Sequence, residues 1–329
     1  MLEPFVDETR TDERFEQGAR TILVQLWYPT DEARGEHSLY FPDPNVVDAV
    51  KADSSVPDRV ETWRGLRTHA LENAPIAGGR FPLVLFSHGF GMARNYYTSW
   101  IEELVSNGFV VAAIDHPFSG LTRIDGRVIA LEPHPDGPKG KTAEMAQDLQ
   151  FLLNTLQKVP GVDGDQIAAI GHSIGGAVAL EACRLDERLV ACVNLDGAAF
   201  GRFAATGVGK PFMVIHQKPV FADATPDGTL AQLGREIEAE WQGIIAKQSA
   251  PVVRLSVRGT GHFSFSDALF IRPELIEEGT GEVADPLQVL RETTWVIVQF
   301  LRNAFSGNAD GEMTLPPLIT PARLGDVTS

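Results

Sequence analysis

The sequence predicts a single domain of the α/β class, built on a doubly wound and mostly parallel sheet. Three observations support this prediction. Short apolar runs that read as buried strands alternate with amphipathic stretches of helical period. The 329 residues contain no internal repeat and no low-complexity tract. A chain of this length can bury a substantial core without help from disulfides or a structural metal.

Seven runs rich in apolar and β-branched residues read as strands. Most are apolar on both faces, which is typical of central strands in a parallel sheet. In chain order they are Thr21–Pro29, Phe81–Gly89, Phe109–Pro117, Ile167–Ser173, Val190–Ala198, Pro211–Gln217 and Pro251–Gly259.

Five stretches between or after these runs place apolar residues three and four positions apart, as amphipathic helices do. Gly108 ends the first helix, and Asp285 with Pro286 opens the last one. The predicted helices lie at 97–105, 145–156, 175–189, 230–245 and 285–301.

Residues 118–140 do not fit this alternation. They are rich in Gly, Pro and charge, with a candidate hairpin at Asp125–Gly126. Long excursions at strand ends are often lids or binding loops, so we expect this segment to be a lid.

Two further segments flank the predicted core. Residues 31–80 are mostly polar, and we expect a short helix around Glu61–Asn73. Residues 307–329 form a tail rich in Pro and Gly that should wrap the surface or be loose. The domain thus covers 1–329, with its core at about 20–305.

The balance of charge excludes several classes of protein. The formal charge is −16, with 44 acidic and 28 basic side chains. Nucleic acids and anionic membranes both require a basic surface, so neither is an expected partner. The acidic start has no basic and apolar signal sequence, and no apolar run is long enough to cross a membrane. We expect a soluble cytoplasmic protein, or an exported one if a leader precedes this sequence.

The two cysteines, Cys183 and Cys192, are too few for a disulfide scaffold. Cys183 falls in a predicted helix and Cys192 at the start of the next strand, so we interpret both as small buried hydrophobic residues. No Cys/His cluster has the spacing of a metal site, and we expect neither metal nor cofactor.

The segment Gly171-His172-Ser173-Ile174-Gly175 fits the pattern G-x-S-x-G. A buried strand precedes it and a helical stretch follows, which is the context that this pattern requires. A tight strand-to-helix turn lifts a serine hydroxyl above the strand ends, and the helix N-terminus can stabilise an anion. We therefore predict that Ser173 is a nucleophile rather than an idle turn residue.

A serine nucleophile needs a base, which follows it in the chain order Ser, acid, His. His262 lies in the loop after the last strand, Gly259-Thr260-Gly261-His262-Phe263, and is the best candidate. The remaining histidines lie at or near strand ends, before the nucleophile, or in polar loops; they are His37, His69, His88, His116, His134, His172 and His216.

Three acids could orient the imidazole. Asp196 ends the strand after the nucleophile helix, and Asp223 lies beyond the following strand. We favour Asp196 because it adjoins the strand end directly, and we keep Asp223 as the alternative. Asp267 follows His262 closely and is better interpreted as a helix N-cap.

Two backbone amides are expected to bind the oxyanion. One belongs to Ile174, directly after the nucleophile, and the other to Phe90 in the Gly-rich segment Ser87–Gly91 after an early strand. Phe118, Phe200 and Phe263 also lie in or near these motifs, and we name them as candidate substrate-pocket residues, with core packing as the alternative.

With these motifs in hand, the chain resembles the α/β-hydrolase superfamily, and within it the plasma-type (isoform II) platelet-activating factor acetylhydrolases and their bacterial relatives. The resemblance extends from about residue 20 to 305. It rests on LWYPT (26–30), LFSHGFG (85–91), NGFVVAAIDHP (107–117), GHSIGG (171–176), VNLDGA (193–198) and RLSVRGTGHFSFSD (254–267).

The resemblance implies that Ser173 is the nucleophile, Asp196 the acid and His262 the base, with oxyanion amides at Phe90 and Ile174. It also implies hydrolysis of short or oxidised acyl chains on lipids, or of simple short-chain esters, without a metal. The sequence therefore predicts a serine carboxylic ester hydrolase that acts on a small-molecule ester or lipid. The alternatives are a polyester or dienelactone hydrolase, an acyltransferase or thioesterase on the same triad, and a binding module without turnover.

Overall fold

The apolar runs of the sequence become strands of one large sheet. The computed structural model describes residues 2–51, 63–217, 229–271 and 283–322. The strands of the sheet are β1 (Leu2–Thr11), β2 (Ala19–Trp27), β5 (Phe81–Ser87), β6 (Val110–Asp115), β9 (Val162–His172), β10 (Leu189–Leu195), β11 (Phe212–Gln217), β12 (Val252–Val257) and β13 (Ile319–Pro321). They lie in the order β1-β2-β6-β5-β9-β10-β11-β12-β13.

The strands from β6 to β12 in this order all run parallel. The predicted α/β class with a mostly parallel sheet is confirmed. β2 is different, because it pairs antiparallel with both β1 and β6. The expectation of a central parallel strand at Thr21–Pro29 is therefore wrong. An apolar run indicates burial but not direction, and a short connection from β1 makes β2 its antiparallel neighbour.

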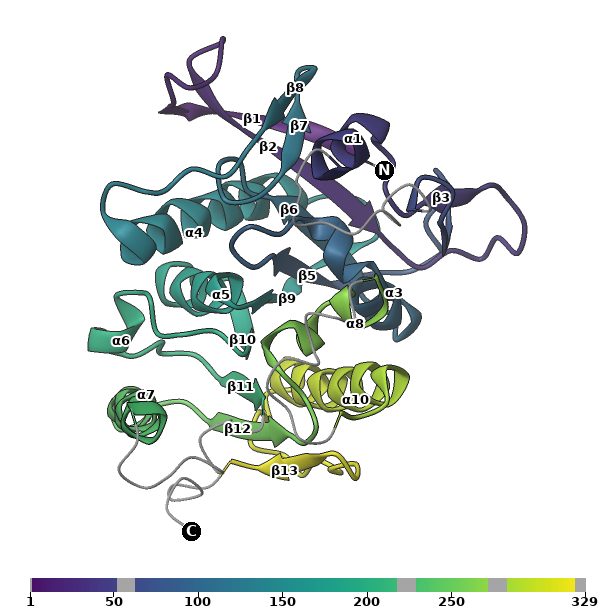
Figure 1. Cartoon of the computed structure of the whole chain (residues 1–329). Coiled ribbons are helices and arrows are strands. Elements are labelled where there is room, and N and C mark those ends of the chain that lie inside the picture. The colour runs from purple at the N-terminus through teal and green to yellow at the C-terminus, as the bar shows by residue number, and fades with distance from the viewer. Residues whose placement is uncertain (1, 52–62, 218–228, 272–282, 323–329) are drawn as a thin grey trace.

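Helices cover both faces of the sheet, as the alternation predicts (Figure 1). One face packs against α3 (Thr98–Ser106) and α10 (Pro286–Phe305), and the other against α4 (Gly137–Leu156), α5 (Ile174–Leu185) and α7 (Thr229–Ile245). Each helix turns its buried apolar residues towards the strands, which is the main stabilising contribution of an amphipathic helix. Among the described helices, none is both long and apolar enough to cross a membrane.

The candidate lid contains the hairpin that the sequence predicts. β7 (Thr122–Ile124) and β8 (Arg127–Ile129) pair antiparallel across the turn at Asp125–Gly126. Ile124 and Ile129 pack with Phe15 and Phe118 in a small separate cluster. The hairpin is thus anchored by its own apolar contacts beside β2 rather than by the main core.

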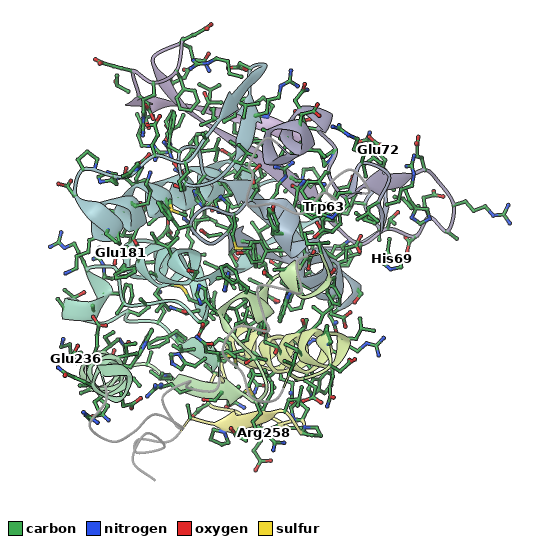
Figure 2. The ribbon with its side chains drawn as sticks, viewed as in Figure 1. Trp63, His69, Glu72, Glu181, Glu236 and Arg258 are labelled. Carbon is green, nitrogen blue, oxygen red and sulfur yellow. A yellow bond between two sulfur atoms is a disulfide. The ribbon has the colours of Figure 1, made fainter. Side chains whose placement is uncertain are left out.

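The segment 31–80 contains β3 (His37–Leu39), α1 (Pro44–Lys51) and β4 (Arg67–Leu71). The helix expected at Glu61–Asn73 is wrong in its described part, because β4 forms there and pairs with β3. Residues 61 and 62 lie outside the described residues. Trp63, labelled in Figure 2, stacks on Phe41 within the segment, with ring centroids 5.4 Å apart. Phe41 also packs against Tyr96, with ring centroids 6.1 Å apart, and this contact fastens the segment to the domain.

The tail wraps the sheet edge. β13 pairs antiparallel with β12, and Ile319 is buried at that edge. Pairing along the edge covers backbone groups of β12 that would otherwise be exposed. Residues 323–329 lie outside the described part.

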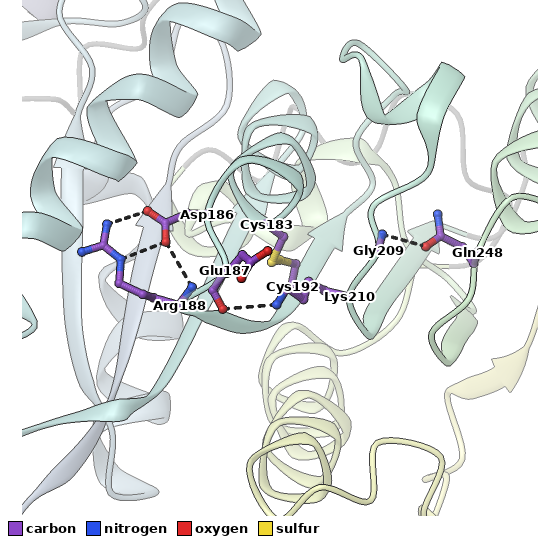
Figure 3. The surroundings of a disulfide bond; sticks show 8 residues. All are labelled: Cys183, Asp186, Glu187, Arg188, Cys192, Gly209, Lys210 and Gln248. Atoms are coloured by element: carbon purple, nitrogen blue, oxygen red, sulfur yellow. Dashed lines mark hydrogen bonds and ion pairs between the residues drawn. A yellow bond between two sulfur atoms is a disulfide. The ribbon is translucent and has the colours of Figure 1, made fainter.

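The two cysteines correct another expectation. Cys183 of α5 and Cys192 of β10 form a disulfide with their Cα atoms 6.5 Å apart (Figure 3). Both are almost fully buried, as the sequence predicts, but they are not separate hydrophobic residues. The chain reverses between α5 and β10, so residues nine apart in sequence face each other across the helix–strand contact. This reversal brings the Cα atoms into the range that a disulfide needs.

Candidate active site

Ser173 occupies the turn between β9 and α5, at the carboxyl edge of the sheet. Its backbone has φ 57° and ψ −127°, a region that costs about 1–3 kcal/mol for a residue with a side chain. The strand end holds it there, because the Ser173 amide donates to the carbonyl of Leu195 on β10 at 2.9 Å. A side chain at Gly175 would collide with the carbonyl oxygen of Ser87, so the last glycine of the motif allows β5 to lie against the first turn of α5.

His262 lies within hydrogen-bonding distance of Ser173. It begins a short 3₁₀ helix, His262–Phe265, in the loop after β12. The Nε2 atom of His262 is 3.0 Å from the Oγ of Ser173, and its Nδ1 is 2.7 Å from the Oδ2 of Asp196. The structure thus brings Ser173, Asp196 and His262 into one hydrogen-bonded chain. Its order is that of nucleophile, base and orienting acid.

Asp196 lies directly after β10 and is held from two sides. Its Oδ1 accepts a hydrogen bond from the Gln217 amide at 3.0 Å, while Oδ2 faces the imidazole of His262. Burial on its own would raise the pKa of Asp196. The hydrogen bond and charge of His262 and the Gln217 amide outweigh burial, so the pKa lies below its usual range. A permanent carboxylate here would stabilise His262 when the imidazole is protonated.

A cavity of about 400 Å³ opens beside Ser173. Phe90 and Ile174, whose amides are the predicted oxyanion donors, both line it. Ile174 is the first residue of α5, and an amide at this position has no acceptor within its own helix. The lining is mostly apolar, and it consists of Phe90, Pro133, His134, Gly137, Pro138, Lys141, Ser173, Ile174, Asp196, Ala198, Phe200 and His262.

The predicted pocket residues divide into two groups. Phe200 lines the cavity and is 37% exposed, like Phe90 at 46%. Phe118 is buried instead among Phe15, Ile124 and Ile129, and Phe263 packs under the loop with its ring 5.4 Å from that of His262. Neither residue is part of the cavity lining.

The two other candidate acids lie elsewhere. Asp223 falls outside the described residues. Asp267 is buried, and its Oδ2 accepts hydrogen bonds from the Ser99 amide and the Tyr40 hydroxyl. Because Ser99 is in the first turn of α3, Asp267 caps that helix rather than the short helix that follows it, α8 (Ala268–Ile271).

Lys141 is a cavity residue that the sequence did not suggest. It lies in the first turns of α4, and its Nζ donates to the carbonyl of Phe118 at 3.1 Å. Burial lowers the pKa of Lys141, and Glu144 opposes that shift. One lysine in an amphipathic helix carries no local signal of such a position. Together with Pro133, His134 and Pro138, it makes the start of α4 and the loop before it one wall of the cavity.

No group of three His, Cys, Asp or Glu side chains in the described ranges is arranged to hold a metal ion.

Comparison with known proteins agrees with this architecture. The family model for the α/β hydrolase fold matches residues 82–238, and the model for platelet-activating factor acetylhydrolase, isoform II, matches residues 9–119. A solved structure of a ferulic acid esterase from Streptomyces cinnamoneus superposes with a TM-score of 0.76 at 28% identity. That match covers 98% of this chain and 95% of the other.

Among curated proteins, the platelet-activating factor acetylhydrolase of Canis lupus familiaris is 26% identical over 230 residues, which is 56% of this chain and 52% of that protein. The enzyme of Cavia porcellus is 23% identical over 307 residues, or 78% and 66% of the two chains. The matched regions span between about half and two thirds of these relatives' lengths.

The parallel sheet, the strand–serine–helix turn and these matches define the class of the protein, which is an α/β-hydrolase. Within this class, it is similar to the platelet-activating factor acetylhydrolases of isoform II.

Proposed function

We propose that the protein is a serine carboxylic ester hydrolase acting on short-chain acyl esters through an acyl-enzyme. One observation carries the proposal. The Ser173–His262–Asp196 chain, with 3.0 Å and 2.7 Å contacts, lies at the mouth of an apolar cavity that also contains two candidate oxyanion amides. The similarity to platelet-activating factor acetylhydrolases also supports ester hydrolysis.

The reaction follows from the donors and acceptors in the site. Asp196 accepts a hydrogen bond from the Nδ1–H of His262, which leaves the Nε2 lone pair to take the Ser173 proton as Oγ attacks the ester carbonyl. The amides of Phe90 and Ile174 stabilise the oxyanion of the tetrahedral intermediate. Nε2 then donates its proton to the leaving alcohol, and an acyl-Ser173 ester remains. Water, activated by the same imidazole, attacks this ester and releases the acid.

The shape and lining of the cavity support a small, uncharged acyl group. Its volume of about 400 Å³ suits a short chain, and Phe90, Phe200 and Ile174 provide apolar contacts. A phospholipid with a short or oxidised second acyl chain, such as platelet-activating factor, fits this description. An aromatic acyl ester is a second candidate, because the aligned neighbour is a ferulic acid esterase and two phenylalanines line the cavity.

Labelling with a fluorophosphonate tests the nucleophile directly. We expect one adduct per folded chain, located on Ser173, and no adduct in the Ser173→Ala variant. A folded protein that remains unlabelled would contradict the proposal and would favour a binding module without turnover.

A substrate panel tests the acyl group. It should contain p-nitrophenyl esters from two to twelve carbons, methyl ferulate, an acyl thioester, and a phospholipid with an acetyl group at its second position. We expect the highest kcat/KM with the short acyl chains. Preference for the longest chains would contradict the short-chain proposal, and product analysis with added alcohol would reveal an acyltransferase.

Two aspartate variants test the acid. Asp196→Asn keeps the shape of the side chain but removes the charge, and we expect kcat to fall by roughly 10⁴-fold. Asp223→Asn serves as the matched control and should retain activity. Loss of turnover in the Asp223 variant alone would overturn the assignment of Asp196.

A further inference from the structure

The hydroxyl of Tyr97 lies behind the oxyanion segment, in a fully buried position. It accepts a hydrogen bond from the Gly89 amide at 3.0 Å, next to Phe90 in the chain. The same oxygen is 2.8 Å from the Nδ1 of His172. Gly89 is held closely here, because a Cβ on it would be 3.1 Å from the Tyr97 oxygen and 3.2 Å from the Cβ of Ser173.

The protonation of His172 follows from its two partners. Its Nε2 is 2.9 Å from the backbone carbonyl oxygen of His262, and a carbonyl can only accept, so Nε2 carries the proton. Nδ1 of a neutral imidazole is then an acceptor, and it accepts a hydrogen bond from the Tyr97 hydroxyl. The sulfur of Met92, 3.0 Å from the same hydroxyl, is a weaker acceptor.

His172 remains neutral in this environment. Burial lowers its pKa to about 3, and the neighbouring His262 contributes in the same direction. The two imidazole rings lie with centroids 4.7 Å apart and planes tilted by 39°. A neutral ring at this distance supports His262 sterically without opposing the positive charge that the base acquires during the reaction.

Three hydrogen bonds therefore run without a gap from the oxyanion segment to the base. The Gly89 N–H donates to Tyr97, the Tyr97 O–H donates to His172, and the His172 Nε2–H donates to the carbonyl of His262. His172 is the last residue of β9, while Gly89 and Tyr97 follow β5 and His262 follows β12, so the hydrogen bonds join three parts of the chain that are distant in sequence.

We propose that Tyr97 and His172 are positioning residues, which fix the position of the Phe90 oxyanion amide relative to the catalytic imidazole of His262. The proposal rests on the ester-hydrolase function proposed above. It explains why a histidine stands directly before the nucleophile, where a strand-to-helix turn requires no particular side chain. Neither residue touches the substrate; each acts through the backbone of a residue that does.

The Tyr97→Phe variant tests the hydroxyl, because it keeps the ring that packs 4.8 Å from Phe86. It leaves the Gly89 amide and His172 Nδ1 without partners. We expect kcat for a short p-nitrophenyl ester to fall about tenfold or more, with KM changed less than twofold. The matched control is Tyr28→Phe, which removes a hydroxyl that bonds the carbonyl of Ala74 away from the site and should leave kcat unchanged.

Two variants at His172 test its hydrogen bond to the backbone carbonyl of His262. His172→Gln places an N–H near the original Nε2 and can still donate to the His262 carbonyl, whereas His172→Asn is too short to reach it. We expect the Gln variant to retain at least five times the kcat of the Asn variant. Circular dichroism and thermal melting of both variants correct each kcat for the folded fraction, so the pair remains informative even if one of them is less stable.

Wild-type kcat in Tyr97→Phe would overturn the proposal, and so would equal kcat values in the Gln and Asn variants. A KM increase with unchanged kcat would also overturn it, because that pattern indicates weaker substrate binding rather than a displaced site. Failure of the proposed function looks different. In that case the wild-type protein itself would neither hydrolyse the ester nor react with a fluorophosphonate.

Discussion

The described part of the protein contains two hydrogen-bonded Ser–His–Asp chains with nearly identical distances. In the candidate active site, the imidazole of His262 is 3.0 Å from Ser173 and 2.7 Å from Asp196. At the ends of β5 and β6, Nε2 of His116 is 3.0 Å from the Oγ of Ser87, and its Nδ1 is 2.9 Å from the Oδ2 of Asp148 on α4. Distances alone do not distinguish the two chains.

Their surroundings distinguish them. Ser87, His116 and Asp148 are completely buried, whereas the His262 side chain is 37% exposed beside a cavity. Ser87 is the last residue of a regular strand, and Ser173 has a positive φ above a helix N-terminus. The comparison teaches that a hydrogen-bonded triad becomes a candidate active site only when a carbonyl can approach the hydroxyl and an anion can be stabilised there.

The acids of the two chains also differ. Arg20 holds Asp148 with two hydrogen bonds, of 2.8 Å and 3.1 Å, and Arg10 is a further partner at 2.8 Å. Burial would raise the pKa of Asp148, but Arg20 and His116 keep it far below its usual range. Asp148 thus balances buried cations, while the principal partner of Asp196 is a single imidazole. We infer that the buried chain is part of the framework under the oxyanion segment.

The two serines should give the largest contrast. We expect Ser173→Ala to lower kcat for a short p-nitrophenyl ester by roughly 10⁴-fold or more and to leave the free energy of unfolding nearly unchanged. Ser87→Ala should keep kcat within about threefold and lower stability by about 1–3 kcal/mol, because His116 loses a buried partner. Steady-state kinetics and urea unfolding measure both quantities. Loss of activity in a folded Ser87→Ala protein would contradict the framework role.

Asp148→Asn should give the next largest effect, and it should appear in stability. The variant removes the carboxylate that accepts two hydrogen bonds from the buried Arg20 guanidinium, while Asp12 and Glu144 remain as partners. The loss should therefore lie near the lower end of the about 3–5 kcal/mol that breaking a buried pair costs. Urea unfolding would measure the loss, with Asp43→Asn as the control, because Asp43 pairs with Arg123 nearer the surface. A stability change as small as that of the control would show that the buried pair contributes little.

Asp267 is a third buried acid, and its raised pKa makes the stability of the protein depend on pH. Burial raises the pKa of Asp267 to about 6 from an ordinary 3.8, against the hydrogen bonds from Tyr40 and Ser99. The folded state therefore binds this proton more tightly than the unfolded state. Its stabilising contribution is complete below about pH 4 and is lost as the pH rises through 6.

We expect Asp267→Asn to remove this dependence. Relative to the variant, the wild-type protein should lose about 2.5 kcal/mol of stability between pH 4 and pH 7, from a shift of about two pKa units at 1.36 kcal/mol each. Unfolding curves at several pH values would measure the difference. Asp310→Asn, at an exposed position, is the control, and parallel curves for wild type and Asp267→Asn would contradict the prediction.

The sequence predicted the parts of the molecule that depend on local pattern. Each central strand is an apolar run, and Ser173, Asp196 and His262 each follow such a run. Parallel strands bring their carboxyl ends to one edge, so proximity of the three residues was predictable. The direction of β2 was not, because it follows from the hairpin with β1, and residues 2–11 were not among the predicted strands. The strand at residues 67–71 was not either, because it depends on pairing with β3.

The hydrogen-bond partners of individual histidines could not be predicted from the sequence either. His116 follows β6 and His172 ends β9, both at the same edge as the candidate site, and the sequence assigned no partner to either of them. Which nitrogen of each ring faces Asp148, Tyr97 or a backbone carbonyl depends on packing between distant loops. The disulfide is the clearest case, because two cysteines nine residues apart fit a helix–strand pair with or without a bond between them.

Removal of the disulfide should lower stability without changing catalysis. Closing a loop of about nine residues is worth about 2.5 kcal/mol in the chain-entropy description, so the double variant Cys183→Ala with Cys192→Ala should lose about that much. Activity per folded molecule should be unchanged: the bond ties α5 to β10 at the end of the helix remote from Ser173, while the Ser173 amide remains bonded to Leu195. Thiol titration in denaturant should find no free thiol in the wild-type protein without reductant and two after reduction. Two free thiols before reduction would contradict the disulfide. They would also favour the cytoplasmic location expected from the sequence, because structural disulfides are typical of oxidising compartments.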